Sequence, residues 1–74
     1  MTSETIKDEL MALLPRIILR ADIPKYLGQL ISPRYLANLD SAGQGPPRFK
    51  IGKKVAYLRE LFVDWYLERY LILT

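Results

Sequence analysis

The chain has 74 residues, half of them hydrophobic and 26% charged, a composition typical of one small globular domain. It contains neither cysteine nor histidine, which excludes disulfides, thiolate zinc sites, serine–histidine triads and histidine proton shuttles. The net charge is +3, but residues 41–59 carry five basic side chains and no acid, while the remainder carries −2. We therefore expect no enzymatic activity and no cofactor, and a polyanion as a partner.

A first helix is predicted over residues 4–14. Ser3 is a suitable N-cap, and Glu4 lies in the first turn, where the helix dipole favours an acid. Apolar residues follow with helical periodicity at Ile6, Leu10, Leu13, Leu14 and Ile17. Pro15 ends this helix or kinks it, because the residue before a proline avoids the helical region. Residues 1–18 thus form a helix and its connection in front of the main domain, residues 19–74.

Two short helices follow. Asp22 is a suitable cap for the first of them, Pro24 is tolerated in its opening turn, and Gly28 ends it. Ser32 and Pro33 are a cap residue followed by a proline at the first helical position, a strong start signal for the second. Leu36 and Leu39 are predicted to face inward from this second helix, and Gly43 to end it.

A short β-hairpin is predicted after the irregular segment Gly43–Pro47. The alternation places Phe49, Ile51, Val55 and Tyr57 on an inner face, and Arg48 and Lys50 on an outer one. The tip is predicted at Gly52–Lys54.

The last helix is predicted over Arg59–Leu73 and is apolar on two sides. One stripe holds Leu58, Leu61, Phe62 and Trp65, and the other holds Val63, Tyr66, Leu67, Tyr70 and Leu71. A helix with two apolar sides must be covered twice. We expect the N-terminal helix, from the same chain or from a second copy, to cover the second stripe.

Two short helices followed by a basic hairpin predict a mainly α fold with a small β-hairpin, a winged helix-turn-helix with an extra N-terminal helix. In this arrangement the second helix enters the major groove of DNA. Its outward residues would be Arg34, Tyr35, Asn38 and Ser41; arginine matches guanine and asparagine matches adenine in bidentate geometry. The wing would contribute Arg48, Lys50, Lys53 and Lys54, enough to neutralise about four phosphates. Asp40 would repel phosphate, so we expect it to face away or to lie beside a base amino group.

The segment Gly43–Tyr57, followed by Trp65, resembles the GxGPP…G…V.Y…W pattern of excisionase-like proteins, the small AlpA-type regulators with a MerR-like winged-helix domain. The resemblance covers residues 19–69. It implies a phage or mobile-element protein that regulates transcription or directs DNA recombination beside an integrase. It also implies that Gly45, Pro46 and Pro47 shape the entry to the wing and that Trp65 anchors the last helix. The turn Gly28–Ile31 is about two residues longer than in that family.

An alternative interpretation is a non-enzymatic interaction module that docks a larger phage or recombination protein through its apolar terminal helices. A homodimer, an integrase or the transcription machinery are the protein partners that these interpretations allow. The acids Glu60, Asp64 and Glu68 form a flat row, which favours a solvated edge over a metal site. The apolar runs are far shorter than the ~18–20 residues of a membrane span, and no signal peptide is recognisable. We therefore expect a soluble, cytoplasmic protein without a membrane or small-molecule partner.

Overall fold

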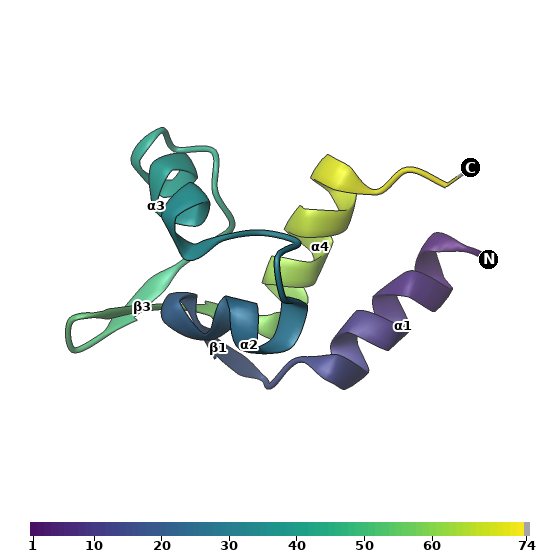
Figure 1. The fold of residues 1–74 in the computed structure, drawn as a ribbon, viewed down its shortest axis with the longest axis horizontal. Coiled ribbons are helices and arrows are strands. Elements are labelled where there is room, and N and C mark those ends of the chain that lie inside the picture. The colour runs from purple at the N-terminus through teal and green to yellow at the C-terminus, as the bar shows by residue number, and fades with distance from the viewer. Residues whose placement is uncertain (74) are drawn as a thin grey trace.

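The computed structural model describes residues 1–73, a mixed α/β arrangement of helices around a three-stranded antiparallel sheet (Figure 1). In chain order the elements are α1 (Ser3–Leu13), β1 (Ile17–Leu19), the 3₁₀ turn η1 (Arg20–Asp22), α2 (Ile23–Leu27), α3 (Pro33–Ser41), β2 (Phe49–Ile51), β3 (Lys54–Leu58) and α4 (Arg59–Tyr70). The molecule measures 38 by 24 by 20 Å. Helix α3 and the β2–β3 hairpin lie at one end, and α1 lies with both termini at the other.

Helix α1 begins and ends one residue earlier than predicted, and its cap is a different residue. Thr2, not Ser3, is the N-cap, and its Oγ1 accepts a hydrogen bond from the backbone N–H of Thr5 at 3.2 Å. Thr2 has the extended backbone that a cap requires, whereas Ser3 already lies within the helix. At the other end Leu14 is extended, as expected for the residue before Pro15.

The strand β1 was not predicted, because Ile17 continues the periodicity of the first helix. Ile17 instead pairs with Leu58, and Ile18 with Tyr57, so that β1 lies beside β3 at the edge of the sheet. The side chains of Ile18 and Tyr57 are fully buried, and Ile17 lies on the opposite, exposed face. The pairing joins residues about 40 positions apart, and a local pattern carries no information about such a contact.

The hairpin is present, but the predicted inner face is wrong. Phe49 pairs with Ala56, Lys50 with Val55 and Ile51 with Lys54. Directly paired side chains share a face, so Lys50 lies on the face of Val55 and Tyr57, opposite Phe49 and Ile51. The reason is the two-residue turn at Gly52 and Lys53, which pairs odd-numbered residues with even-numbered ones. Gly52 has φ 63°, in the left-handed region that favours glycine, and Lys54 is already the first residue of β3.

Helix α4 contributes to a core assembled from most elements of the chain. The core consists of Leu14, Ile18, Ile23, Leu27, Ile31, Leu36, Tyr57, Phe62 and Val63. The prediction that Leu58 and Leu61 also point inward is wrong: their exposed fractions are 46% and 43%. Val63 is fully buried, and α1 packs against α4 within the same chain.

Helix α4 also ends three residues earlier than predicted. Its last residue is Tyr70, and Leu71 has an extended backbone. The first turn of α1, with Ser3 and Glu4, lies beside Leu71.

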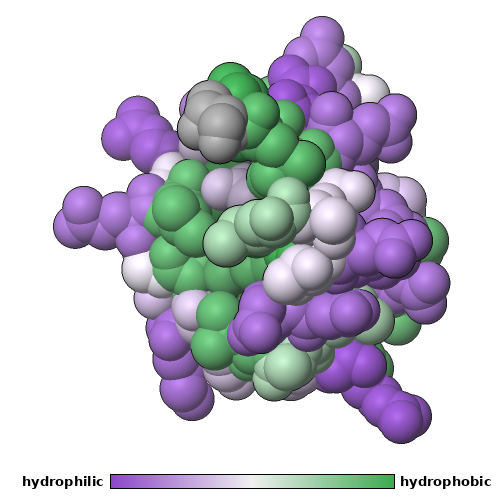
Figure 2. All heavy atoms as spheres, turned by 90° about the vertical axis from the view of Figure 1, so that its right-hand side faces the viewer, coloured by the Kyte–Doolittle hydropathy of each residue, from purple (hydrophilic) through white to green (hydrophobic). Residues whose placement is uncertain are grey.

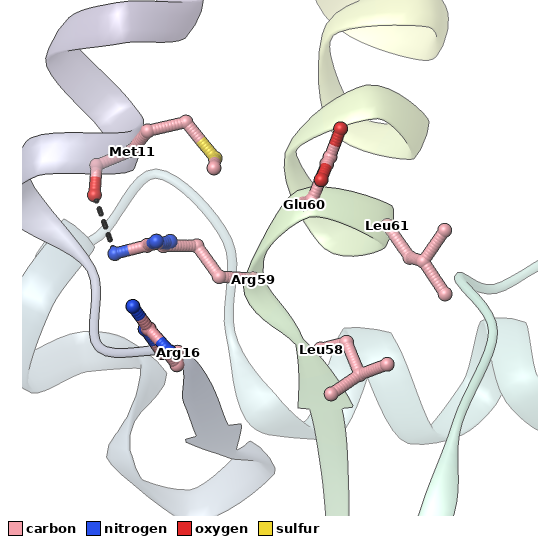
Figure 3. A pocket seen from close by; sticks show the side chains of 6 residues that line it. All are labelled: Met11, Arg16, Leu58, Arg59, Glu60 and Leu61. Atoms are coloured by element: carbon pink, nitrogen blue, oxygen red, sulfur yellow. Dashed lines mark hydrogen bonds between the residues drawn. The ribbon is translucent and has the colours of Figure 1, made fainter.

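Arg59 holds the C-terminal end of α1 against the start of α4. Its Nη1 donates hydrogen bonds to the backbone oxygens of Met11, at 3.0 Å, and of Leu14, at 3.2 Å. Figure 3 shows the Arg59 side chain pointing toward Met11, with Leu58 and Leu61 on the other side of the chain. A cation at the C-terminus of a helix satisfies carbonyl groups that have no partner within the helix. The N-cap position of α4 is held by Leu58, whose side chain cannot accept a hydrogen bond, so α4 has no side-chain cap.

Candidate nucleic-acid interface

The segment α2–α3 is formed as the sequence predicts. Helix α2 starts with Pro24 in its first turn and ends at Gly28, whose φ of 59° favours glycine. Asp22 precedes α2, but its side chain makes no capping hydrogen bond, because the 3₁₀ turn η1 leads directly into the helix. Ser32 does cap α3: its Oγ accepts a hydrogen bond from the N–H of Tyr35 at 3.0 Å.

The four residues predicted to face outward from α3 are all exposed: Arg34, Tyr35, Asn38 and Ser41. Leu36 and Leu39 are buried, as predicted. Arg34 and Asn38 are four residues apart and therefore stand on the same face of α3. Tyr35 differs from the other three because its hydroxyl accepts a hydrogen bond from the hydroxyl of Tyr70 at 3.1 Å. The structure thus directs Tyr35 toward α4 rather than leaving it free.

Asp40 faces away from the outer surface of α3, the first of the two placements expected for it. It is 5% exposed and its Oδ2 accepts hydrogen bonds from the hydroxyl of Tyr57, at 2.9 Å, and from the guanidinium of Arg20. The Arg20 Nε also donates to the Tyr57 hydroxyl at 3.1 Å. Burial tends to lower the pKa of Arg20, but the bonds to Tyr57 and Asp40 outweigh it and raise that pKa. These three side chains form the polar network that joins η1, α3 and β3.

The glycine at position 45 is explained by this network. A Cβ built on Gly45 would lie 1.9 Å from Oδ1 of Asp40, a distance that no real side chain tolerates. Oδ1 itself has no hydrogen-bond partner among residues 1–73, and Nη1 of Arg48 lies 3.9 Å from it. The loop before the hairpin therefore closes directly over a buried carboxylate.

The basic residues of the hairpin divide into two groups. Lys50, Lys53 and Lys54 are exposed and make no ion pair with another described residue. Arg48 is exposed as well, but its ion pair with Asp40 directs it toward the base of the hairpin. The hairpin therefore presents three free cations, one fewer than the sequence predicts.

The tip of the hairpin lies close to the start of α3. Lys53 and Lys54 line the same surface hollow as Pro33, the first residue of α3, and Arg20 from η1. In this way the two predicted contact regions, separated by about 20 residues along the chain, adjoin in space. Figure 1 shows both at the end of the molecule away from the termini.

The loop between α3 and β2 is attached to α4. Nε1 of Trp65 donates a hydrogen bond to the backbone oxygen of Gln44 at 3.0 Å. Nη2 of Arg69 donates a second hydrogen bond to the side-chain Oε1 of Gln44 at 3.3 Å. Trp65 thus fixes the loop that leads to the hairpin to α4, and its ring also contacts Phe62 in the core.

Arg20 is the residue of this region that the sequence reasoning missed. It lies outside the basic segment 41–59, and nothing in its neighbourhood along the chain marks it. The signal that could have indicated Arg20 is Asp40, because an acid on a predicted DNA-recognition helix is expected to face inward. Such an acid requires buried donors, and Arg20 and Tyr57 are those donors.

The row of acids on α4 is exposed to solvent, as predicted, and two of its members also face Lys7 of α1. Nζ of Lys7 lies 2.9 Å from Asp64 and 3.8 Å from Glu60, so α1 and α4 are joined by an ion pair. Within residues 1–73, no group of three or more acidic side chains converges as it would around a metal ion. None of the helices in this part of the chain has the length and apolar character needed to cross a membrane.

Comparison of the chain with known protein families, curated proteins and solved structures gave no significant match. The resemblance to excisionase-like proteins therefore stays a prediction that depends on the motif residues alone.

Proposed function

We propose that the chain binds double-stranded DNA with sequence preference, as a transcription regulator or a recombination directionality factor of a phage or mobile element. In this proposal α2 and α3 are a helix-turn-helix, α3 is the recognition helix, and β2–β3 is the wing. The observation that carries the proposal is the position of Lys53 and Lys54, which share a hollow with Pro33 at the start of α3. One duplex could then contact both elements together.

The residues available for each role support the proposal. Arg34 and Asn38 are exposed on one face of α3, and both side chains suit bidentate contacts to base edges in the major groove. Lys50, Lys53 and Lys54 are free cations on the hairpin, suited to phosphate. The one acid of α3 and the hairpin, Asp40, is buried and bonded to Arg20 and Tyr57, so it does not oppose the approach of DNA.

A salt titration tests the proposal. The association constant for random duplex DNA is measured at several salt concentrations. If the hairpin neutralises about three phosphates, the logarithm of this constant should fall with the logarithm of the salt concentration with a slope near −3, at about −0.9 per contact. Replacing Lys53 and Lys54 by alanine should flatten this slope by about two and keep any sequence preference. Lys7→Ala with Arg16→Ala is the matched control, since it removes the same charge from α1 and its connection.

Two results would contradict this function. One is the absence of DNA binding at low salt, where phosphate contacts are strongest. The other is a slope that changes equally in the hairpin variant and in the control, because the affinity would then depend on net charge alone.

A second candidate function is a protein-interaction module, and a specific observation favours it. The apolar side chains Leu30, Ile72 and Leu73 are exposed at the end of the molecule opposite the hairpin, with exposed fractions of 64%, 80% and 52%. The two functions are compatible, because they use opposite ends of the molecule.

A further inference from the structure

An apolar groove crosses the end of the molecule that carries both termini. We call it the terminal groove; it is lined by Ile6 and Leu10 of α1, Leu67 of α4, Leu71 and Ile72 after α4, and Leu30 of the α2–α3 loop. Figure 2 shows this end of the molecule, with hydrophobic atoms gathered in its centre and hydrophilic atoms around them. This surface has no part in the DNA interface proposed above.

The terminal groove is bordered by acids on one side. A second hollow shares Leu67 and Leu71 with the groove and is therefore continuous with it. Its charged lining residues are the acids Glu4, Asp64 and Glu68 and one cation, Lys7. Asp64 is paired with Lys7 at 2.9 Å. Glu4 and Glu68 are exposed and form no ion pair with any residue that the structure describes. Two free carboxylates thus stand beside an apolar channel.

The charge of the whole molecule is divided in the same direction. Helices α1 and α4, which frame the groove, hold six acids and three bases, a net charge of −3. The other residues hold eight bases and two acids, a net charge of +6. A second copy that docked by the same groove would bring two acidic ends together. Like charges across an interface oppose association, so a symmetric dimer through this groove is disfavoured.

We propose that the terminal groove binds an amphipathic helix of a partner protein, with an apolar stripe flanked by Lys or Arg. Helices recognised in this way present apolar residues at i, i+3 or i+4, and i+7 to a groove. The basic residues would pair with Glu4 and Glu68 at the rim, where they contribute orientation and choice of partner more than affinity. The inference goes beyond the proposed DNA binding and does not depend on it.

The test is a selection from a library of displayed 16-residue peptides, built on a helix-favouring alanine scaffold with the other positions randomised. The bait is the full chain. The expected result is enrichment of peptides with a helical apolar stripe and an excess of Lys and Arg over Asp and Glu. Glu4→Lys combined with Glu68→Lys should reverse the charge preference of the selected peptides.

Substitutions at exposed positions locate the binding surface without disturbing the core. Leu30→Ser with Ile72→Ser should weaken the best peptide at least tenfold in fluorescence polarisation. The matched control is Leu13→Ser with Ile51→Ser, since both residues are apolar and half-exposed but lie outside the groove. Circular dichroism of each variant verifies that the fold is kept, and the affinity of the groove variant for random DNA should match that of the unchanged chain.

The proposal is overturned by any of four results. In the selection, these are the absence of enriched peptides and the enrichment of peptides without an excess of Lys and Arg. In the affinity measurement, it is an equal loss of peptide affinity in the groove and control variants. In light scattering, it is a doubled mass of the unchanged chain that the groove variant abolishes. The last would identify a second copy as the occupant. Failure of the chain to bind DNA would overturn the proposed function but leave this inference standing.

Discussion

At the scale of single residues, the polar network around Asp40 explains why a carboxylate is buried in this small domain and why residue 45 is a glycine. A buried carboxylate is tolerated only when it is hydrogen-bonded and paired with a cation. Tyr57 and Arg20 supply those bonds. The network couples the candidate recognition helix α3 to β3 of the hairpin, so it holds the two parts of the proposed interface in a fixed relation.

Gly45→Ala should destabilise the protein strongly. The new Cβ would lie 1.9 Å from Oδ1 of Asp40, so the loop must shift or the carboxylate must leave its bonds to Arg20 and Tyr57. Forcing extra volume into a packed site typically costs about 1–3 kcal/mol, and urea unfolding would measure it. In an Asp40→Ala background the same substitution should cost much less, because the clashing oxygen is gone. Equal costs in the two backgrounds would show that the clash is not the cause.

Tyr57 should make the stability depend on alkaline pH. Burial raises the pKa of its hydroxyl; the hydrogen bond from Arg20 lowers that pKa and the bond to Asp40 raises it, with a net increase. The unfolded chain therefore loses this proton at a lower pH than the folded chain, near the ordinary value of about 10. The contribution to stability is complete below that pH and declines as the pH rises through the folded pKa.

Tyr57→Phe should remove part of that decline, measured as the free energy of unfolding in urea between pH 8 and 11. Some decline should remain, because burial also raises the pKa of Tyr66. Tyr26→Phe is the control, as its hydroxyl lies outside the network. An identical slope in Tyr57→Phe and the unchanged chain would exclude the Tyr57 proton as the source.

At the scale of elements, α3 and the hairpin have separate tasks in the proposed function. Contacts to phosphate fix position, and contacts to base edges specify sequence. Arg34 and Asn38 point outward from α3, while the free lysines are on the hairpin. We therefore expect specificity and general affinity to separate when the two elements are altered one at a time.

Arg34→Ala and Asn38→Ala should each cost about 1–3 kcal/mol on the best DNA site and little on random DNA, if each makes a bidentate base contact. The best site would be found by selection from random duplexes, and affinities would be compared by fluorescence polarisation. Gln29→Ala, on the exposed turn between α2 and α3, is the control. Equal losses on both kinds of DNA would identify the residue as a phosphate contact instead.

At the scale of the whole molecule, α1 completes the domain within one chain. It packs on α4, and Leu14, which follows its last residue, belongs to the core. Arg59 holds its C-terminal end, and Lys7 pairs with Asp64 along its length. The N-terminal helix is thus not an appendage. The strand β1 also straddles residues 18 and 19, where the sequence places the start of the main domain.

Deleting residues 1–14 should destabilise the chain and promote association. The deletion removes the helix that packs on α4 and removes Leu14 from the core, and the loss of one large core side chain alone costs about 2–5 kcal/mol. The exposed stripe of α4 would then favour contact with a second copy. Urea unfolding and light scattering measure the two effects. Lys7→Ala should change stability far less than the deletion, since the ion pair is partly exposed. A truncated chain that stays monomeric and equally stable would refute the role of α1 as a cover.

The sequence by itself determined the features that depend on near neighbours. The extents of α1, α2 and α3 follow from proline, glycine and cap residues within a few positions, and Ser32 caps α3 as predicted. The exposure of Arg34 and Asn38 and the inward position of Leu36 follow from helical periodicity in the same way.

Only the tertiary structure decided the features that join distant parts of the chain. Ile17 belongs to a strand because Leu58 pairs with it, and the faces of the hairpin depend on the length of the turn at Gly52. The bonds of Asp40 to Arg20 and of Arg59 to α1 likewise join elements 20 or more positions apart. Such contacts result from the packing of complete elements, and a local pattern contains the propensity of each element but not the identity of its partner.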